Sequence, residues 1–351
     1  MFFTGKITMS HGGGGAVMQS LIKDYVVKYL GGSGAEVPLE ALDDSAVIDD
    51  IVFKSDSHTV KPLFFPGGDI GRLAVAGTVN DIAVMGAEPL ALSTGFIIEE
   101  GFPLDDFERI LKSMQAACLE AGVYVLTGDT KVMERGALDR IVINTSGIGR
   151  RSPWLDKNLE EVRRHRTLNS RWLLDSNLAP GDRIIVSGTI GDHGIAVLSS
   201  REGYGFETEV KSDVAPLNLI IKEVLKVGGI VKVKDPTRGG LANTLNEWSE
   251  KSRTGIIISE EAIPIKRGVR MACEMLGIDP LEVGNEGKLV IASIPDKAEE
   301  ILEVLKKTPI GEAASIIGEA SSEFRGVVLQ TAVGGRRIVL PPIGDPVPRI
   351  C

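Results

Sequence analysis

The chain ends in a cysteine, whose thiol is a nucleophile able to carry a chemical group. Cys351 follows the segment 341–350, which contains four prolines. Proline disrupts helix interiors and central strands, so we expect an extended segment reaching about 3.1 Å per residue, roughly 34 Å over eleven residues. A frayed terminus is the alternative. Because the segment has little glycine or serine, we favour a semi-rigid arm that carries the thiol into a pocket and out again.

Acidic side chains form a second set with possible chemistry. Asp43 and Asp44 precede a β-branched run. They could be an ordinary charged turn or, because hard cations prefer oxygen ligands, a Mg²⁺ site. Asp81 follows Asn80 inside an otherwise apolar helix expected over 73–86. A buried carboxylate is costly unless it is paired or bound to a cation, so we favour a functional Asp81.

Glycine-rich turns recur where expected strands end or expected helices begin. Such turns allow close backbone approach, and helix N-termini offer free N–H groups that suit an anion. Each of these segments could also be an ordinary flexible loop or turn without a function. A histidine beside glycine is more often structural than catalytic. Candidates in these turns are the glycines 12–15, the carboxylate and lysine within 127–131, His193, the loop 234–240, and Glu286 as a possible base.

Composition limits the class of protein. Thirty-nine Lys and Arg against 48 Asp and Glu give a net charge of −9, which argues against a nucleic-acid partner. The cysteines at 118, 273 and 351 are too far apart to predict a disulfide framework or a Cys-x-x-Cys metal site. No signal-peptide pattern or long apolar run appears, so we expect a cytoplasmic protein with no membrane association.

These candidates need a scaffold of strands and helices to bring them together. We expect buried strands at 91–98, 123–126 and 141–148, with a helix from about 105 to 120. A polar, charged stretch over about 150–177 should separate two α/β halves, because a second set of strands begins near residue 183. The sequence thus predicts two halves whose polar loops face a common site.

Together, these motifs resemble the ATP-binding superfamily of aminoimidazole ribonucleotide synthetase and selenophosphate synthetase. Within it the chain is similar to the HypE family of hydrogenase maturation proteins, over nearly its whole length. The terminal motif separates this family from its relatives, and the long charged stretch 151–171 is a departure from it. The motifs are SHGGGG (10–15), DDSAV (43–47), FPGGDIG (65–71), GTVNDIAVMG (77–86), TGDTK (127–131), SGTIGDHG (187–194), DPTRGG (235–240), NEGK (285–288) and PRIC (348–351).

The resemblance implies a two-domain PurM-like fold of α/β (α+β) class. Residues 1–155 would form the ATP-binding and dimerisation domain, 156–340 a C-terminal α/β domain, and 341–351 a mobile tail. In a homodimer the N-terminal domains would pack into a shared β-barrel, with ATP and Mg²⁺ in the groove beside it. A carbamoyltransferase, HypF, would carbamoylate Cys351. ATP-dependent dehydration would give a thiocyanate, and cyanide would pass to a HypC–HypD scaffold for the iron of [NiFe]-hydrogenase.

The resemblance also implies roles for single residues. Phosphorylating the amide oxygen makes it a leaving group, which needs metal and in-line positioning. Glu286 would take the N–H protons and Lys131 would stabilise the phosphorylated oxygen, with His193 or His11 as alternative bases. The residues expected to bind Mg²⁺ are Asp43, Asp44, Asp81, Asp129 and Asp235. Those expected around the nucleotide are Gly12, Gly13, Gly14, Gly15, Thr78, Asn80, Thr130, Thr237 and Arg238.

Two other functions remain open at this point. Another ATP-dependent amide- or selenide-activating enzyme of the same superfamily would need no terminal cysteine. A nucleotide-gated maturation scaffold would bind ATP only to set the position of the tail.

Overall fold

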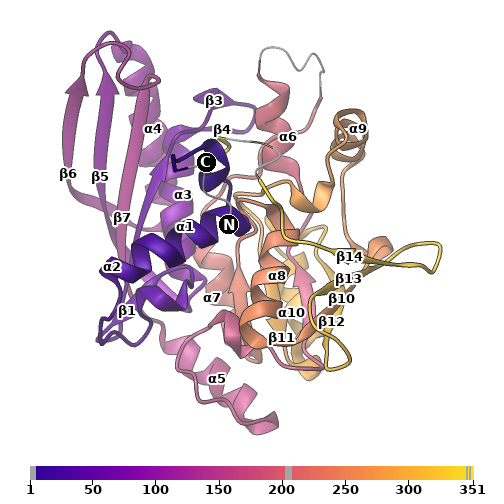
Figure 1. Ribbon diagram of the computed structural model, residues 1–351. Helices are drawn as coiled ribbons and strands as arrows, with labels where there is room; N and C mark the ends of the chain where they lie inside the picture. The colour runs from indigo at the N-terminus through magenta and orange to yellow at the C-terminus, as the bar shows by residue number, and fades with distance from the viewer. Residues whose placement is uncertain (1–4, 202–207, 345–346, 348) are drawn as a thin grey trace.

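The computed structural model describes residues 5–201, 208–344, 347 and 349–351. Asp345, Pro346 and Pro348 of the proline-rich segment, for which we expect an extended conformation, lie outside the described residues. The chain forms two large sheets, one from each half of the sequence, and helices pack against both (Figure 1). The mixed α/β architecture predicted from the sequence is confirmed.

The first sheet contains five strands in the order β1-β2-β7-β5-β6. Strands β5 and β6 are parallel, and the other neighbours are antiparallel. The strands predicted at 91–98, 123–126 and 141–148 fall within or overlap β5, β6 and β7. The strand bounds are β1 (Ala46–Ile48), β2 (Ile51–His58), β5 (Ala87–Glu99), β6 (Tyr124–Met133) and β7 (Ile141–Arg151), and a separate two-stranded ribbon consists of β3 (Phe64–Phe65) and β4 (Gly68–Asp69).

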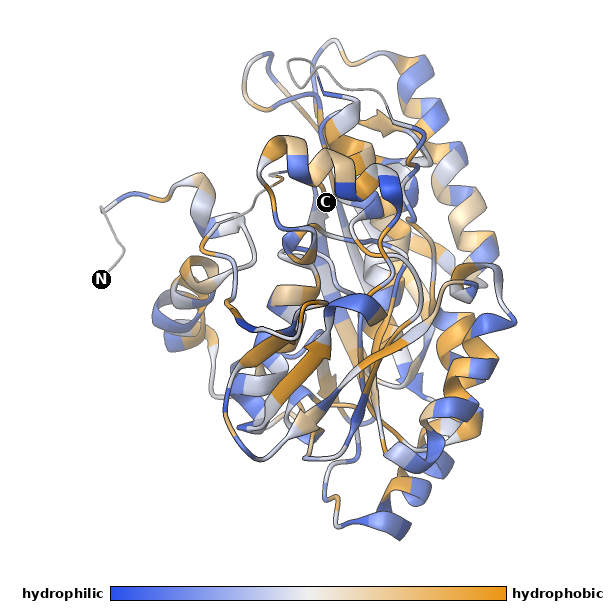
Figure 2. Cartoon of the chain, turned by 90° about the vertical axis from the view of Figure 1, so that its right-hand side faces the viewer, coloured by the Kyte–Doolittle hydropathy of each residue, from blue (hydrophilic) through white to orange (hydrophobic). Residues whose placement is uncertain are grey.

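The second sheet contains seven strands in the order β14-β13-β10-β12-β8-β11-β9. Its central strands are almost entirely buried, because helices cover them. Figure 2 shows apolar residues concentrated on central strands, whereas outer helices carry both polar and apolar residues. The bounds are β8 (Arg183–Val186), β9 (Ile230–Lys234), β10 (Gly255–Ser259), β11 (Val290–Ser293), β12 (Ser315–Ser321), β13 (Val327–Gln330) and β14 (Arg336–Val339).

The helices belong to both halves. The helix expected over 105–120 is α4, and the charged stretch after residue 150 includes α5, whose apolar side is buried. The bounds are α1 (Ala16–Leu21), α2 (Lys28–Leu30), α3 (Ile70–Ala83), α4 (Leu104–Ala121), α5 (Pro153–His165), α6 (Asp192–Ser199), α7 (Asn218–Val227), α8 (Gly240–Ser252), α9 (Arg267–Leu276) and α10 (Pro295–Lys306). None of the described helices is both long and apolar enough to cross a membrane.

Helix α3 is the most deeply buried helix of the N-terminal half. Asp69 begins it by accepting hydrogen bonds from the N–H groups of Gly71 (2.8 Å) and Arg72 (3.0 Å), an N-cap that satisfies otherwise unpaired donors. Nearly all its residues are buried, because it packs against the first sheet on one side and α4 on the other. Such a helix can place polar residues in the interior.

The N-terminal helical segment and the end of the tail both lie at the junction of the halves. The N-terminal helical segment 16–30 lies across it in Figure 1, held to α8 by Gln19–Glu247 (3.1 Å) and Lys23–Glu250 (3.4 Å). At the other end, Val347 and Ile350 are completely buried in the apolar core around α3. The end of the tail is therefore docked onto the body of its own chain.

Candidate active site

Two adjoining cavities lie where the halves meet. The larger, of about 630 Å³, is bounded by the N-terminal helical segment, the 38–46 loop, β2 and the start of α8. The smaller, of about 40 Å³, contains Cys351 in its lining. Four residues line both, so they form a shared wall: Asp81, Asp235, Thr237 and Arg238. A ligand in the larger cavity and a group on the cysteine would meet at this wall.

The backbone of the tail holds Cys351 in place. The N–H of Thr59 donates to the carbonyl oxygen of Cys351 (3.3 Å), and the N–H of Lys61 donates to that of Arg349 (3.1 Å). Arg349 in turn donates to the carbonyl of Thr59 (2.9 Å) and pairs with Asp139 (2.7 Å). The tail therefore lies along the chain just beyond β2, with its terminal residue half-buried in the small cavity.

Negative charge is concentrated at the shared wall. Burial raises the pKa of Asp81 to about 6, although Lys54 is only 2.5 Å away and opposes the shift. Burial, with Asp81 and Asp44 nearby, raises the pKa of Asp235 well above its ordinary value. Glu286 lines the small cavity, and burial and the adjacent Asp235 raise its pKa likewise. In the described part of the chain, Asp235 Oδ2 and Glu286 Oε1 are buried without hydrogen-bond partners. Oxygen ligands with such uncompensated charge suit a divalent cation.

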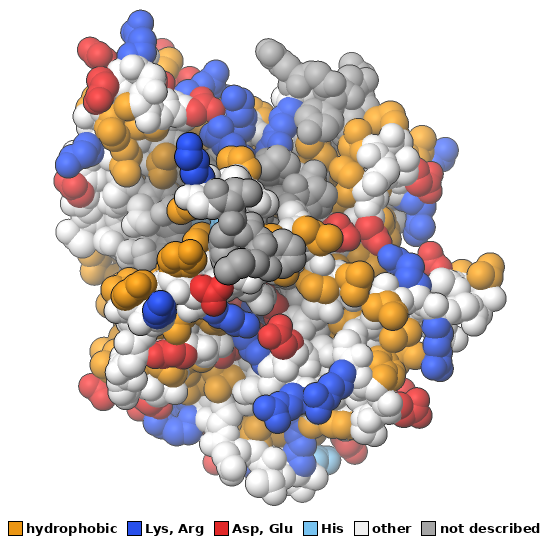
Figure 3. Space-filling model, viewed as in Figure 1, with side chains coloured by type: hydrophobic (Ala, Val, Ile, Leu, Met, Phe, Trp, Pro, Cys, Tyr) orange, Lys and Arg blue, Asp and Glu red, His pale blue; other side chains and the backbone are white. Residues whose placement is uncertain are grey.

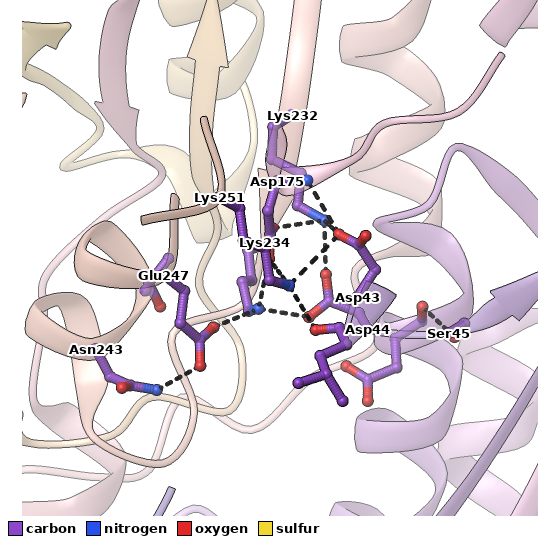
Figure 4. A network of polar contacts seen from close by, with 12 residues as sticks. Asp43, Asp44, Ser45, Asp175, Lys232, Lys234, Asn243, Glu247 and Lys251 are labelled. Carbon is purple, nitrogen blue, oxygen red and sulfur yellow. Dashed lines mark hydrogen bonds and ion pairs between the residues drawn. The ribbon is translucent and has the colours of Figure 1, made fainter. Parts of the chain in front are cut away.

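Asp43 and Asp44 belong to a different arrangement, a network of ion pairs with Lys232, Lys234 and Lys251 (Figure 4). Lys232 Nζ lies 2.8 Å from Asp44 and 3.1 Å from Asp175, while Lys234 lies 3.0 Å from Asp44. Burial alone would raise the pKa of Asp44, but the two lysines lower it to about 2. The carboxylate of Asp44 is thus already charge-neutralised by its neighbours.

Lys232, Lys234 and Asp175 were missed by the sequence reasoning. Lys232 is completely buried. The sequence pattern that could have revealed them is the alternation Ile-Val-Lys-Val-Lys in β9. It places both lysines on the same face of the strand. Lys251 completes the network from α8, 2.7 Å from Asp175.

The five carboxylates that we expected to bind Mg²⁺ do not form one cluster. Among the described residues, no three Asp, Glu, His or Cys side chains are arranged around one point as metal ligands. Asp129 lies on β6 with Thr130 and Lys131, where the side chains are exposed and line neither cavity. Asp81 and Asp44 lie near enough to Asp235 for their negative charges to raise its pKa.

Two residues expected around a nucleotide have structural roles instead. Asn80 is completely buried, and its side chain bonds the backbone of Leu217 (2.7 Å) and Ala215 (3.2 Å). Thr78 is also completely buried, with its hydroxyl 2.6 Å from that of Thr145. Neither side chain lines the larger cavity, and both are bonded to protein groups, so contact of Thr78 and Asn80 with a nucleotide stays a prediction.

The glycine run is divided among several surfaces. Gly14 lines the larger cavity, whereas Gly12 and Gly13 line a cavity beside the end of the tail. A Cβ at Gly15 would lie 1.9 Å from the carbonyl oxygen of Pro342. The glycine run therefore allows a close approach of backbone, as expected. At Gly15 the approaching backbone is that of the tail.

Three further candidates are placed by the structure around the thiol. Arg238 lines both cavities, and the negative charge of Cys351 is the main cause of its raised pKa. His193 is completely buried and bonds the backbone of the tail, so its position does not fit the alternative role of a base facing the small cavity. His11 lines the cavity on the other side of Cys351.

Some residues of the small cavity had no sequence signal. His58 and Asp56 on β2 line it together with Glu286 and Cys351. Asp213 fixes the turn that carries Glu286, because it accepts from the N–H of Glu286 (3.1 Å) and from Asn285 (2.7 Å). An isolated histidine or aspartate in a loop or strand has no local pattern that predicts its partners.

Comparisons with known proteins agree with this architecture. The model of the AIR synthase related protein family, N-terminal domain, matches residues 42–151, and that of its C-terminal domain matches 179–329. The chain is 54% identical to a hydrogenase expression/formation protein of Methanocaldococcus jannaschii, covering 99% of this chain and 100% of that one. It is 45% identical to the carbamoyl dehydratase HypE of Azotobacter vinelandii, covering 99% and 98%.

Solved structures that resemble this chain are also HypE proteins. A HypE–HypF complex contains a chain that is 46% identical with a TM-score of 0.82, covering 92% of this chain and all of that one. The hydrogenase maturation protein HypE in complex with ATP is 41% identical with a TM-score of 0.78, covering 99% and 100%. The two matched domains, the fold and the identity over the full length lead to one conclusion: the chain belongs to the AIR synthase related family and, within it, to the HypE carbamoyl dehydratases of hydrogenase maturation.

Proposed function

We propose that this enzyme uses ATP and Mg²⁺ to dehydrate an S-carboxamide on its own Cys351 to a thiocyanate, the source of the cyanide ligands of [NiFe]-hydrogenase. The observation that carries the proposal is the shared wall between the two cavities. A thiol on an 11-residue tail lies in the small cavity, next to a larger one of about 630 Å³. A nucleotide in the larger cavity would direct its γ-phosphate toward the group on the cysteine.

The residues of the wall fit this reaction. When bound, Mg–ATP would supply the γ-phosphoryl group that turns the amide oxygen into a leaving group. Asp81 and Asp235 are the residues of the wall proposed to hold the metal, because the charge of Asp81 raises the pKa of Asp235 and a cation would relieve this repulsion. Arg238 and Thr237 would stabilise charge on the phosphoryl group, since they line both cavities.

Glu286 is the proposed base for the amide protons. It is buried, its Oε1 has no partner among the described residues, and it lines the small cavity with Cys351. Burial favours a base whose pKa lies nearer to neutral pH, where proton transfer is most effective. Asp213 positions it by holding its backbone N–H.

A homodimer with a shared β-barrel is supported by the edges of the first sheet. Strand β6 is an exposed edge of ten residues, and long bare edges are rare in native proteins. At the opposite edge, β1 pairs only with Ile51–Phe53, so among the described strands residues 54–58 of β2 have no neighbour on that side and could pair with a partner. If the sheets of two chains join edge to edge, β6 of one chain would carry Asp129, Thr130 and Lys131 to the site of the other.

The remaining parts of the proposal concern the setting of the reaction. The structure of a HypE–HypF complex supports a HypF-type carbamoyltransferase as the partner that carbamoylates Cys351. A HypC–HypD scaffold is the proposed acceptor of cyanide. Three cysteines that form no disulfide are compatible with a reducing cytoplasm. We further propose the domain division 1–155, 156–340 and a mobile tail 341–351 that leaves the site for transfer.

Mass spectrometry of the C-terminal peptide tests the proposal. The protein is incubated with the carbamoyltransferase, carbamoyl phosphate and ATP, and Cys351→Ala is the control. We expect a carbamoyl group on Cys351 that loses the elements of water only with hydrolysable ATP. ATP consumption with an unmodified peptide would instead favour another amide-activating reaction. Tail movement with ATP but no turnover would favour a nucleotide-gated scaffold.

A further inference from the structure

Lysine side chains line the larger cavity, where the nucleotide is proposed to bind. In the described part of the chain they are Lys23, Lys54, Lys234 and Lys251. A lysine that turns to a ligand leaves its carboxylates behind, and a buried carboxylate without a partner is costly. Lys23 is half-exposed and pairs with Glu250 at 3.4 Å. For the other three, the ion pairs of each lysine indicate which one is able to change partners.

Two of these lysines are held by groups that have no second donor. Lys54 lies 2.5 Å from Asp81 and 3.3 Å from Asp56, and neither carboxylate forms another ion pair among the described residues. Lys251 donates to the carbonyl oxygen of Leu42 (2.6 Å) in addition to its ion pairs. Moving either lysine would therefore leave an acceptor without its partner.

Lys234 differs, because the carboxylates around it are also paired with other lysines (Figure 4). Its Nζ lies 3.0 Å from Asp44 and 3.6 Å from Asp175. If Lys234 left, Asp44 would keep Lys232 at 2.8 Å. Asp175 would keep Lys232 at 3.1 Å and Lys251 at 2.7 Å. Neither aspartate would lose its last cation.

The third partner of Lys234 is likewise supported by other donors. Lys234 Nζ lies 2.7 Å from Glu247 Oε2. The other oxygen, Oε1, accepts from the side-chain amides of Gln19 and Asn243, each at 3.1 Å. Glu247 would therefore stay hydrogen-bonded without the lysine, and its side chain is partly exposed to the solvent.

Lys234 also has the charge and the freedom that binding an anion requires. Burial alone would lower its pKa, but Asp175, Asp44 and Glu247 raise the pKa well above its ordinary value, so the side chain is a cation at neutral pH. It is the last residue of β9, and the ammonium group sits on a flexible four-carbon stem. Lys232, on the same strand, is completely buried and lines neither cavity.

We propose that Lys234 changes partners when ATP binds, moving from the ion network to the phosphates that leave as ADP. This rests on the proposed function, in which ATP occupies the larger cavity. Lys234 lines that cavity but not the small one, whereas Arg238 lines both. Arg238 thus faces the phosphoryl group that is transferred, and Lys234 the phosphates behind it. A cation there stabilises the negative charge that develops on the departing ADP.

The test measures the affinity of full-length protein for ATP, ADP and adenosine by calorimetry in the presence of Mg²⁺. Lys234→Met removes the charge but keeps an unbranched side chain, and Lys234→Arg keeps the charge. The matched control is Lys251→Met, because Lys251 lines the same cavity and belongs to the same ion network. Denaturant unfolding of each variant measures the structural role of its lysine separately.

We expect Lys234→Met to weaken the binding of ATP and ADP about 10- to 100-fold, the range of one hydrogen bond to a charged group. Adenosine, which has no phosphate, should bind as it does to the wild type. Lys234→Arg should recover part of the loss. Lys251→Met should keep most of the affinity for ATP and lose more stability than Lys234→Met, because the Leu42 carbonyl loses its donor.

Three results would overturn the assignment of Lys234. One is an unchanged affinity of Lys234→Met for ATP. Another is an equal loss for adenosine, which would mean a damaged cavity. The third is an equal loss of ATP affinity in Lys251→Met, which would mean that the field of the whole network acts. If the wild-type protein binds ATP but forms no thiocyanate on carbamoylated Cys351, the proposed function fails while the assignment of Lys234 stands.

Discussion

His193 Nε2 lies 2.7 Å from the carbonyl oxygen of Ile350, the residue that precedes the terminal cysteine. The ring is completely buried between this carbonyl and the hydroxyl of Ser212, 2.7 Å from Nδ1. Since a carbonyl can only accept, Nε2 carries the proton and Nδ1 accepts from Ser212. A histidine that we expected as an alternative base is therefore a clamp for the docked tail.

Removing this clamp should release the thiol. We expect His193→Ala to raise the rate at which a thiol reagent modifies Cys351 by about 2- to 10-fold, because one net hydrogen bond is worth about 0.5–1.5 kcal/mol. His193→Gln, which keeps an N–H donor near the position of Nε2, should stay closer to the wild-type rate. The other two cysteines are buried and react slowly. Equal rates in all three proteins would contradict a role for His193 in docking.

The lysine network should dominate the stability of the junction between the halves. Lys232→Met removes the closest cation of Asp44 and one of the cations around Asp175, and breaking a buried pair costs about 3–5 kcal/mol. Denaturant unfolding measures this loss. The matched control is Lys226→Met, whose pairing with Glu223 lies at the surface and should be worth less than about 1 kcal/mol. Similar losses in both variants would contradict the importance of burial.

His58 should make the protein less stable in mild acid. Its pKa is lowered to about 4 when folded, against an ordinary value of 6.5. Because the unfolded chain binds this proton more readily, the contribution of the neutral ring to stability is complete above pH 6.5. It is lost as the pH falls toward 4, by about 3 kcal/mol.

This loss can be isolated by comparison. We expect the free energy of unfolding of His58→Asn to fall less steeply than that of the wild type between pH 6.5 and 4. Other groups titrate in both proteins, so only the difference between the curves is assigned to His58. Parallel curves would show that the ring is not held neutral.

Mixed dimers test whether β6 completes the site of the other subunit. Lys131→Ala and Glu286→Gln should each be inactive alone, since both residues belong to the proposed site. If Lys131 serves the partner, a mixed dimer has one site with both defects and one intact site. Random mixing in equal amounts should then recover about a quarter of the wild-type activity. If the mixed dimers recover no activity, Lys131 and Glu286 of one chain act in the same site.

The glycine loop can be probed with two neighbouring substitutions. Gly15→Ala would place a Cβ 1.9 Å from the carbonyl oxygen of Pro342. We expect this crowding to cost about 1–3 kcal/mol and to speed modification of Cys351, because Pro342 is at the base of the tail. Gly12→Ala meets open space and should change stability by less than about 0.5 kcal/mol. An equal cost for both would mean that loop flexibility, not close approach, is what matters.

Local patterns in the sequence were enough to predict several helices and strands and to select candidate residues for the chemistry. The 3.6-residue period predicted α4 nearly to its ends, and apolar runs predicted strands that fall within or overlap β5, β6 and β7 of the first sheet. The terminal cysteine, Glu286, Asp81, Asp235, Thr237 and Arg238 were all selected from motifs, and they line the small cavity. Such patterns are readable because helix and strand periods are set by neighbours a few residues away.

Only the tertiary structure decided what each polar group faces. Lys232 and Asp44 are 188 positions apart, and their contact determines that Asp44 is neutralised. Asn80 and Thr78 lie in the same motif as Asp81, yet their side chains bond buried partners while Asp81 faces both cavities. His58 has no motif, and its Nδ1 has no hydrogen-bond partner among the described residues because Thr145 bonds the other ring nitrogen. The charge and availability of a buried group depend on desolvation and on its partners, and both come from segments that meet only in the folded chain.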